Sequence, residues 1–555
     1  MSSKIRLFQS TLKSQTSFKE YANGKGTTYF YNAAQRLTKR KWARGIETNY
    51  IYTNGDLTAI TYSDDTPTVS FLNYRSNGRP GRIVDVSGTR TLTYSNFGDV
   101  ADETYSGSSL FSGLTIHRGF DGAMRQNLSA TLSGTTIVPA ATYGYDPATH
   151  RLESIQQGNV TVNYGYAPNS TLLASATSQL GTVALVRSAE YNAAGQLTSV
   201  VNGMGATVLN ANGTPASPIL YDTAGRRTHI PRENDTQWVY GYNTRGEVTS
   251  GSKQFTGGSA ILGYQFGYQY DDIGNRVQTT ANGQNSTYVP NALNQYTQRD
   301  IPGVADILGS AHPEATVTIN DTATERQDGL FYWQFGVNNT NGPVLLTATT
   351  TGVRKGAATD GKDVVTQTVG SLYVPQTPEF YTYDDDGNLT QDGHWIYTWN
   401  GENRLVAMET ISAIPVIAKA KLTFAYSAEG KRIQKKVYEW NSQNNSYQLA
   451  SEIRFVYDEW NVIAEMDATN TVERSYLWGQ DLSGMLQGAG GVGGLLAVTT
   501  TEANAGTYLA TTDANGNVLG LVDSQGAISA TYEYGPFGEP IRVSGAMAMQ
   551  NPFKF

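Results

Sequence analysis

One eight-residue pattern returns along most of the sequence and constrains the fold more than any other feature. It starts with Tyr, continues with Asp or Asn, has Gly at its fifth position and often ends in Thr. Its clearest copies supply Tyr221, Asp222 and Gly225, then Tyr270, Asp271 and Gly274, and later Tyr383, Asp384 and Gly387. An Asp or Asn side chain accepts backbone hydrogen bonds in turns, and Gly adopts positive φ without steric penalty. Each octet therefore predicts the tip of a β-hairpin.

The spacing of the octets predicts how the hairpins assemble. The step between Tyr74 and Tyr94 is 20 residues, and the step between Tyr191 and Tyr221 is 30 residues. Strands of about eight residues on each side of a turn use this spacing. One hairpin alone is marginally stable, so many repeats must stack. The sequence predicts an all-β fold in which stacked long β-hairpins form a curved or spiral shell.

Composition supports a β-rich protein and narrows its function. The 555 residues include 58 Gly and 35 Tyr, and only 16% are charged. The net charge is −8 and no basic block is present, which disfavours nucleic-acid binding. With no cysteine, disulfides and thiolate metal sites are excluded. No apolar run has transmembrane length, and Met1 to Lys4 begin no signal peptide. We expect a secreted or cell-surface protein, exported by another route or as part of a longer chain.

The repeats are interrupted once, which predicts the domain organisation. No octet occurs in residues 301–380, although this stretch contains strand-like runs. We predict a β-shell of these repeats over 1–300, a small inserted sandwich-like β-domain over 301–380, more shell over 381–475, and a distinct C-terminal region over 476–555.

The octets, together with three C-terminal phrases, resemble the RHS/YD-repeat family of large bacterial proteins. These phrases are Asp513 to Val518, Tyr532 to Glu539 and Asn551-Pro552-Phe553, and they resemble the start of the RHS repeat-associated core. The family is related to the shell of ABC toxin complexes and to the YD region of teneurins. The resemblance implies a hollow shell that encloses a polypeptide cargo or toxin domain. On this basis, 476–555 is expected to be a truncated core, and the cargo is expected to be absent from this chain. Many members end this core in a DPxG-type self-cleavage site. The sequence has no such motif, so self-cleavage is assigned to no residue here.

No other motif in the sequence assigns a catalytic residue. Gly488, Gly490 and Gly493 match GxGxxG, but a strand-like run follows where a dinucleotide site needs a helix. Residues 513–524 lack the Gly and Glu of a calcium loop. We therefore expect no cofactor and no metal, and we interpret Asp384 to Asp386 as an exposed turn.

Three functions remain open from the sequence. The first is a structural shell fragment that encloses or scaffolds a polypeptide. The second is an extracellular carbohydrate-active protein, either a polysaccharide binder or a lyase, in which Tyr332 and Trp333 are a candidate glycan platform. The third is an adhesin that uses the inserted domain. Whether the chain is an enzyme stays undecided, and the shell is favoured because turn formation explains most of the Tyr and Asp residues.

Overall fold

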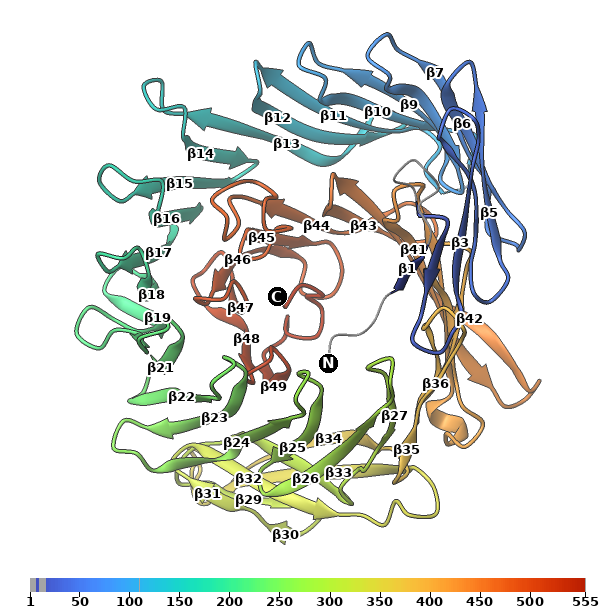
Figure 1. Cartoon of the computed structure of the whole chain (residues 1–555). Helices are drawn as coiled ribbons and strands as arrows, with labels where there is room; N and C mark the ends of the chain where they lie inside the picture. The colour runs from blue at the N-terminus through green and yellow to red at the C-terminus, as the bar shows by residue number, and fades with distance from the viewer. Residues whose placement is uncertain (1–5, 9–15, 109, 555) are drawn as a thin grey trace.

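The computed structural model describes residues 6–8, 16–108 and 110–554. The expectation about a signal peptide concerns Met1 to Lys4, which lie outside this range. The described residues are almost entirely β-structure, as predicted, with a single short 3-10 helix. Nearly every strand outside residues 304–374 pairs antiparallel with the next strand in sequence, so the chain forms one long meander (Figure 1).

Three sheets are formed by the repeats, and we call these three sheets together the wall. The first contains β1 (Arg6–Phe8), β2 (Phe18–Glu20), β3 (Gly26–Tyr31), β4 (Leu37–Lys41), β5 (Glu47–Thr53), β6 (Asp56–Tyr62), β7 (Val69–Tyr74), β8 (Pro80–Asp85), β9 (Gly88–Tyr94), β10 (Val100–Ser106), β11 (Leu114–Asp121), β12 (Met124–Leu132), β13 (Thr135–Tyr145), β14 (Leu152–Gln157), β15 (Val160–Tyr166), β16 (Leu173–Leu180), β17 (Val183–Tyr191), β18 (Leu197–Met204) and β19 (Thr207–Asn212). The second contains β20 (Leu220–Tyr221), β21 (Arg227–Pro231), β22 (Thr236–Tyr242), β23 (Val248–Phe255), β24 (Ala260–Tyr270), β25 (Arg276–Ala281), β26 (Gln284–Pro290), β27 (Tyr296–Arg299) and β35 (Glu379–Phe380). The third contains β36 (Thr382–Tyr383), β37 (Leu389–Gln391), β38 (Trp395–Trp399), β39 (Leu405–Thr410), β40 (Ala420–Tyr426), β41 (Arg432–Asn441), β42 (Ser446–Asp458), β43 (Asn461–Met466), β44 (Val472–Trp478), β45 (Leu495–Thr500), β46 (Gly506–Thr512), β47 (Val518–Val522), β48 (Ile528–Tyr534) and β49 (Pro540–Ser544), with the 3-10 helix η1 (Val416–Ala418) before β40.

Between β27 and β35 the chain forms two smaller sheets. One has three strands, β28 (Val304–Ser310), β31 (Glu325–Gln327) and β32 (Leu330–Gly336). The other has four strands, β29 (Thr316–Ile319), β30 (Thr322–Ala323), β33 (Val344–Arg354) and β34 (Val364–Val374). The wall continues past this segment, because β27 pairs directly with β35 through Arg299 and Glu379.

The wall winds into an inward spiral. In Figure 1 the strands β43 to β49 lie inside the ring formed by the earlier strands, and the C-terminus lies near the centre. We call the described residues between 16 and 300 the first turn, residues 381–554 the second turn, and the contact between them the seam. Hydrogen-bonded residues across the seam are 360 apart at Lys25, 339 apart at Arg90 and 280 apart at Lys253. The path length of one turn therefore falls along the chain, as an inward spiral requires.

The largest core cluster lies in the seam rather than within one sheet. Ile116, Val162 and Leu185 of the first turn belong to the same buried cluster as Met466 and Leu509 of the second. In first-turn strands buried and exposed residues alternate, since only one face meets the second turn. In contrast, every residue of β43 and of β47 is buried. These inner strands are covered on both faces: by the first turn outside and by residues 547–553 inside.

Candidate functional site

The octet tyrosines are hydrogen-bonded to the preceding hairpin in a regular way. Tyr221 Oη donates to the carbonyl oxygen of Leu197 at 2.6 Å, and Tyr270 Oη donates to that of Val248 at 3.0 Å. Both acceptors are the seventh residue of the preceding octet. The same bond joins Tyr242 to Arg227, Tyr426 to Leu405 and Tyr457 to Arg432. Sequence reasoning missed this acceptor because every residue has a carbonyl, so residue type carries no signal there.

Tyr383 makes the same bond across the break in the repeats. Its Oη donates to the carbonyl oxygen of Tyr296 at 2.9 Å, although 87 residues separate the two in sequence. Consecutive hairpins of the wall are thus joined in the same manner on both sides of residues 304–374.

The aspartates and glycines of the octets build the hairpin tips. Asp222 Oδ1 accepts from the backbone N–H of Ala224 at 3.0 Å and of Arg226 at 2.9 Å. Asp271 and Asp384 accept from the two equivalent N–H groups of their own turns. The glycines have positive φ: 79° at Gly225, 92° at Gly274 and 88° at Gly387.

The fifth octet position takes a left-handed conformation even where glycine is absent. Gln35 has a φ of 62°, and Asn403 has a φ of 56°. In the copy that starts at Trp399, Asn403 rather than Gly401 occupies the left-handed position. Asn tolerates this conformation better than most residues. The left-handed backbone conformation at this position is therefore kept in these copies even where the glycine is not.

The aspartate run at 384–386 is only partly an exposed turn, which corrects the sequence interpretation. The side chain of Asp386 has no exposed surface, and its Oδ2 lies 2.9 Å from Arg44 Nε of the first turn. Its Oδ1 accepts from the Ala43 N–H at 2.7 Å. Burial raises the pKa of the Asp386 carboxyl, although Ala43 and Arg44 oppose this rise. Asp386 therefore lies in the seam, and its contact with the first turn could not be predicted from the local sequence.

The two aromatic residues of the candidate glycan platform do not form one exposed surface. Tyr332 is 8% exposed and its Oη donates to Asp306 Oδ1 at 3.0 Å. Its ring lies so close to Gly263 of β24 that a Cβ there would approach a ring carbon to 2.9 Å. Trp333 is the next residue of the same strand and points to the opposite face.

Buried ion pairs close the seam near the middle of the first turn. Asp458 accepts from Arg118 Nε at 2.6 Å and from Arg125 Nη1 at 3.0 Å, one bond to each carboxylate oxygen. These three side chains are less than 10% exposed. Burial alone would raise the pKa of Asp458, but the two guanidinium groups hold it below its ordinary value.

A second buried group adjoins this one through Arg118. Arg118 Nη2 lies 3.5 Å from Glu103, and Glu103 accepts from Arg90 Nη1 at 3.1 Å. Arg90 in turn contacts both oxygens of Glu429, at 2.7 and 2.9 Å. Burial would raise the pKa of Glu103, yet Arg118 and Arg90 lower it overall. Charges from both turns therefore form one continuous buried network.

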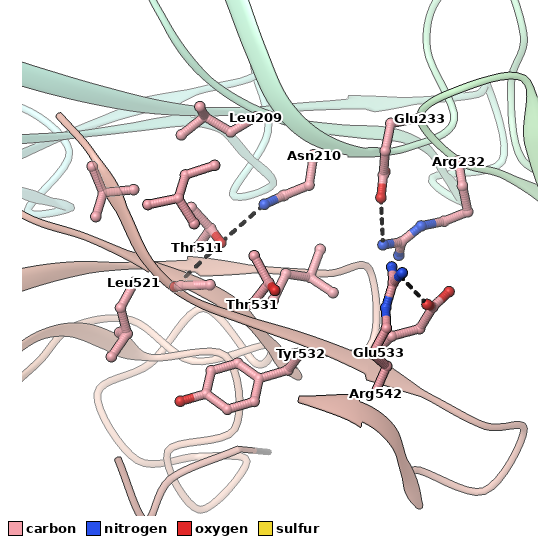
Figure 2. A pocket seen from close by; sticks show the side chains of 14 residues that line it. Leu209, Asn210, Arg232, Glu233, Thr511, Leu521, Thr531, Tyr532, Glu533 and Arg542 are labelled. Atoms are coloured by element: carbon pink, nitrogen blue, oxygen red, sulfur yellow. Dashed lines mark hydrogen bonds and ion pairs between the residues drawn. The ribbon is translucent and has the colours of Figure 1, made fainter. Parts of the chain in front are cut away.

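The third group surrounds a small cavity at the C-terminal part of the seam (Figure 2). This cavity of about 120 Å³ lies between β19 and the start of the β21–β22 turn on one side and β46 to β49 on the other. Asn210 Nδ2 donates to Thr511 Oγ1 at 3.1 Å across the two turns. Arg232 lies 3.3 Å from its neighbour Glu233, and Arg542 lies 3.2 Å from Glu533.

Glu533 is fully engaged and therefore suited to holding the turns together rather than to proton transfer. It pairs with Lys253, and its Oε2 accepts from Tyr264 Oη at 2.9 Å. Burial would raise the pKa of Glu533, but Lys253 and Arg542 lower it. Burial also raises the pKa of Tyr264, so this hydroxyl keeps its proton. A general base works best with a pKa near the working pH, which Glu533 lacks.

Over residues 6–8, 16–108 and 110–554, no three His, Cys, Asp or Glu side chains are grouped in a way that could hold a metal ion. Within the same residues, no helix has the length and apolarity needed to cross a membrane.

Comparison with solved structures returns TcdB2-TccC3 proteins and a Tc holotoxin. A crystal structure of TcdB2-TccC3 without the hypervariable C-terminal region aligns with 97% of this chain at 14% identity and a TM-score of 0.43; this chain covers 28% of it. A structure of the Photorhabdus luminescens Tc holotoxin pore aligns with 96% of this chain at 11% identity and a TM-score of 0.31, with 31% of it covered.

Comparison with curated proteins returns a sequence relative. The tRNA3(Ser)-specific nuclease WapA of Bacillus spizizenii is 32% identical over 168 residues, which are 30% of this chain and 6% of that protein. The tRNA nuclease WapA of Bacillus subtilis strain 168 is 29% identical over the same length, with the same coverage. The chain thus spans a small part of the length of these relatives, and no family model matches it. The regular Tyr-Asp/Asn hairpins and the sequence match to WapA, an RHS-repeat protein, bear out the resemblance of this chain to the RHS/YD-repeat family.

Proposed function

We propose that this chain is a wall segment of an RHS-type shell that sequesters a polypeptide by steric enclosure and works outside the cell. The observation that carries the proposal is the course of the chain's own last residues. Residues 547–553 run along the inside of the second turn, where Met547 and Asn551 have no exposed surface. Phe553 packs edge-on against Tyr476 and Trp478, with ring centroids 4.7 and 5.2 Å away. The inner face of the wall therefore packs against polypeptide, which at residues 547–550 is in a turn conformation.

The buried seam supports the same function. A wall that excludes proteases and water must join its successive turns without gaps. Paired charges at Asp458 and Glu533 do this inside an apolar interface, where an unpaired charge would be costly. The pairs also fix which strand of the first turn meets which strand of the second.

The test is protection of an added segment from proteolysis. A short peptide with a protease site is attached after Phe555 in one protein, and the same peptide is inserted at the exposed tip between Asn444 and Asn445 in a second. Both proteins are exposed to the protease under native conditions. We expect the C-terminal site to be cut at least about tenfold more slowly, since cleavage there requires the wall to open. Equal cleavage rates at the two sites would contradict enclosure.

We also propose that residues 301–380 are an insertion into an otherwise continuous wall of residues 1–300 and 381–475, followed by the core region 476–555. The support is the Tyr383–Tyr296 bond and the β27–β35 pairing, which bypass the segment. Replacing residues 303–375 with a short linker is expected to leave a folded protein. Its melting temperature should fall, because Ile261 and Tyr264 lie in a cluster with Leu308 and Leu330. Loss of the β-sheet circular dichroism signal would contradict the insertion.

No observation favours polysaccharide binding, polysaccharide cleavage or adhesion. The Tyr332 ring is buried, and its hydroxyl is already hydrogen-bonded within the segment. The nuclease activity in the name of WapA is not proposed for this chain, because the match covers only 6% of that protein.

A further inference from the structure

A second cavity in the seam is larger than the one beside Glu533 and contains more arginines than carboxylates. It has a volume of about 360 Å³ and lies between β16 to β18 of the first turn and β45 and β46 of the second. Pockets that bind small organic molecules have volumes of about 300–1,000 Å³. Two guanidinium groups line this cavity, those of Arg187 and Arg227, together with one carboxylate, that of Asp481.

Arg187 lies on β17, and its side chain has no partner among the described residues. Its backbone pairs with both neighbouring strands, but neither a hydrogen bond nor an ion pair joins its guanidinium to any described residue, and its Nε atom is buried without an acceptor. The other seam arginines behave differently: Arg90, Arg118 and Arg125 each pair with at least one carboxylate. Among the described residues, the Arg227 guanidinium bonds to neutral groups: the Tyr221 hydroxyl, the Asn515 side chain and the Ala514 carbonyl oxygen.

The nearby carboxylates are occupied within their own loops. Asp481 accepts from Ser483 N–H at 2.9 Å through Oδ1 and from Gly491 N–H at 3.2 Å through Oδ2. Asp513 accepts from the backbone N–H of Asn517 at 2.9 Å and from its side-chain amide at 2.8 Å. Neither aspartate is therefore available as a dedicated partner for Arg187.

An unpaired, partly buried guanidinium is unfavourable, and arginine does not escape by losing its proton. Burial lowers the pKa of Arg187, with Tyr191 and Asp513 partly opposing the shift, but the group remains charged at neutral pH. The chemical group that would pair with Arg187 is thus an anion. Around the guanidinium the cavity is lined by aliphatic side chains, among them Ala176, Leu185, Leu496 and Ala510.

We propose that this cavity binds a small organic anion, whose carboxylate-type head pairs with Arg187 and whose apolar body packs against Leu185 and Leu496. Because Leu185 belongs to the first turn and Leu496 to the second, the ligand joins the two turns. The site is independent of whether the shell encloses a polypeptide.

The probes are octanoate, which has a carboxylate head and an apolar body, and acetate and inorganic phosphate, which have only the head. Binding is measured by titration calorimetry and by the shift of the melting temperature at constant ionic strength. We expect octanoate to bind at least about tenfold more tightly than acetate or phosphate, because only octanoate fills the apolar part. No measurable octanoate binding, or tighter binding of phosphate, would overturn the proposal.

Three variants locate the binding site. Arg187→Met is expected to weaken octanoate binding by at least about tenfold, since it removes the charge-assisted pair. Ala176→Leu is expected to weaken octanoate but not acetate, because it fills the apolar part and leaves Arg187 in place. The matched control is Arg151→Met, since Arg151 lies outside the cavity and stacks on Tyr166 at 5.4 Å. Octanoate binding that survives Arg187→Met, or falls equally in Arg151→Met, would refute the site.

The ligand-free protein gives an independent readout. If the Arg187 guanidinium is unpaired, Arg187→Met removes an uncompensated, partly buried charge, and its melting temperature should equal or exceed that of the parent protein. A lower melting temperature would show that Arg187 has a partner within the fold and would contradict the proposal.

Discussion

The residues of the octet are of two kinds: those that shape the β-turn of one hairpin and those that join one hairpin to the next. Gly225 and Asp222 act within one hairpin, through a φ of 79° and two backbone hydrogen bonds. Tyr221 acts between hairpins, through its bond to Leu197. Substitutions at the two kinds of position should therefore differ in size and in their physical cause.

The first prediction concerns the backbone at Gly225. Gly225→Val should lower the free energy of unfolding by about 1–3 kcal/mol, because a β-branched residue is strained at positive φ. Gly225→Asn should cost less, since Asn tolerates this conformation. The measurement is chemical denaturation. Gly257→Val is the control, because Gly257 is not at positive φ and a Cβ there meets nothing within 4 Å. An equal decrease in the free energy of unfolding for Gly225→Val and Gly257→Val would contradict the assignment of Gly225 to a β-turn that requires positive φ.

The second prediction concerns the hydroxyl of Tyr270. Tyr270→Phe removes the bond to Val248 and should lower the free energy of unfolding by about 0.5–1.5 kcal/mol. Tyr438→Phe is the matched control, since no hydrogen bond joins the Tyr438 hydroxyl to another described residue; its effect should stay within about 0.5 kcal/mol. Thermal and chemical denaturation both measure the difference. An equal effect in the two variants would mean that the repeated bond adds no stability.

Among the strands, burial distinguishes the two turns. Strands of the first turn alternate between buried and exposed residues, as β15 does, whereas β43 and β47 are buried throughout. The corresponding sequence, such as Val518-Leu519-Gly520-Leu521-Val522, is a continuous apolar run, which is typical of strands covered on both faces. This signal was available in the sequence and marks the inner strands. It does not reveal which first-turn strands cover them.

The third prediction concerns the ion pairs between strands of different turns. Asp458→Ala leaves Arg118 and Arg125 buried without their counter-ion, so the free energy of unfolding should fall by about 3–5 kcal/mol. Glu459→Gln is the neighbouring control: the Glu459 side chain is 60% exposed, and its loss should change stability by less than about 1 kcal/mol. Hydrogen exchange should show faster opening around β11 and β43 in Asp458→Ala only. Slow exchange that persists in this variant would show that the ion pair does not hold the seam.

For the whole molecule, closure depends on contacts between residues about 280–360 apart in sequence. Stacked repeats alone would let each hairpin unfold with only its neighbours. The seam couples distant repeats and should make unfolding more cooperative. Its carboxylates also make closure depend on pH.

The fourth prediction gives the direction of this pH dependence. The pKa values of Asp458, Glu103 and Glu533 are lowered in the folded protein, whereas unfolded Asp and Glu titrate near about 3.9 and 4.3. The stabilisation is therefore complete above about pH 5 and is lost as the pH falls through the lowered folded values. The melting temperature, followed by circular dichroism, should fall steeply below about pH 4. A melting temperature that is constant or rises from pH 5 to pH 3 would contradict this assignment.

By itself, the sequence determined the all-β class, the stacked hairpins and the resemblance to RHS/YD-repeat proteins, because turn chemistry at octets such as Tyr270 to Val277 is local and repeats at regular spacing. The tertiary structure alone decided the inward winding, the burial of Asp386 beside Arg44, and the contrast between the paired Arg118 and the unpaired Arg187. The physical reason is distance along the chain. A hairpin tip is specified by a few neighbouring residues, whereas a seam contact depends on the curvature accumulated over about 280–360 residues, which no local pattern encodes.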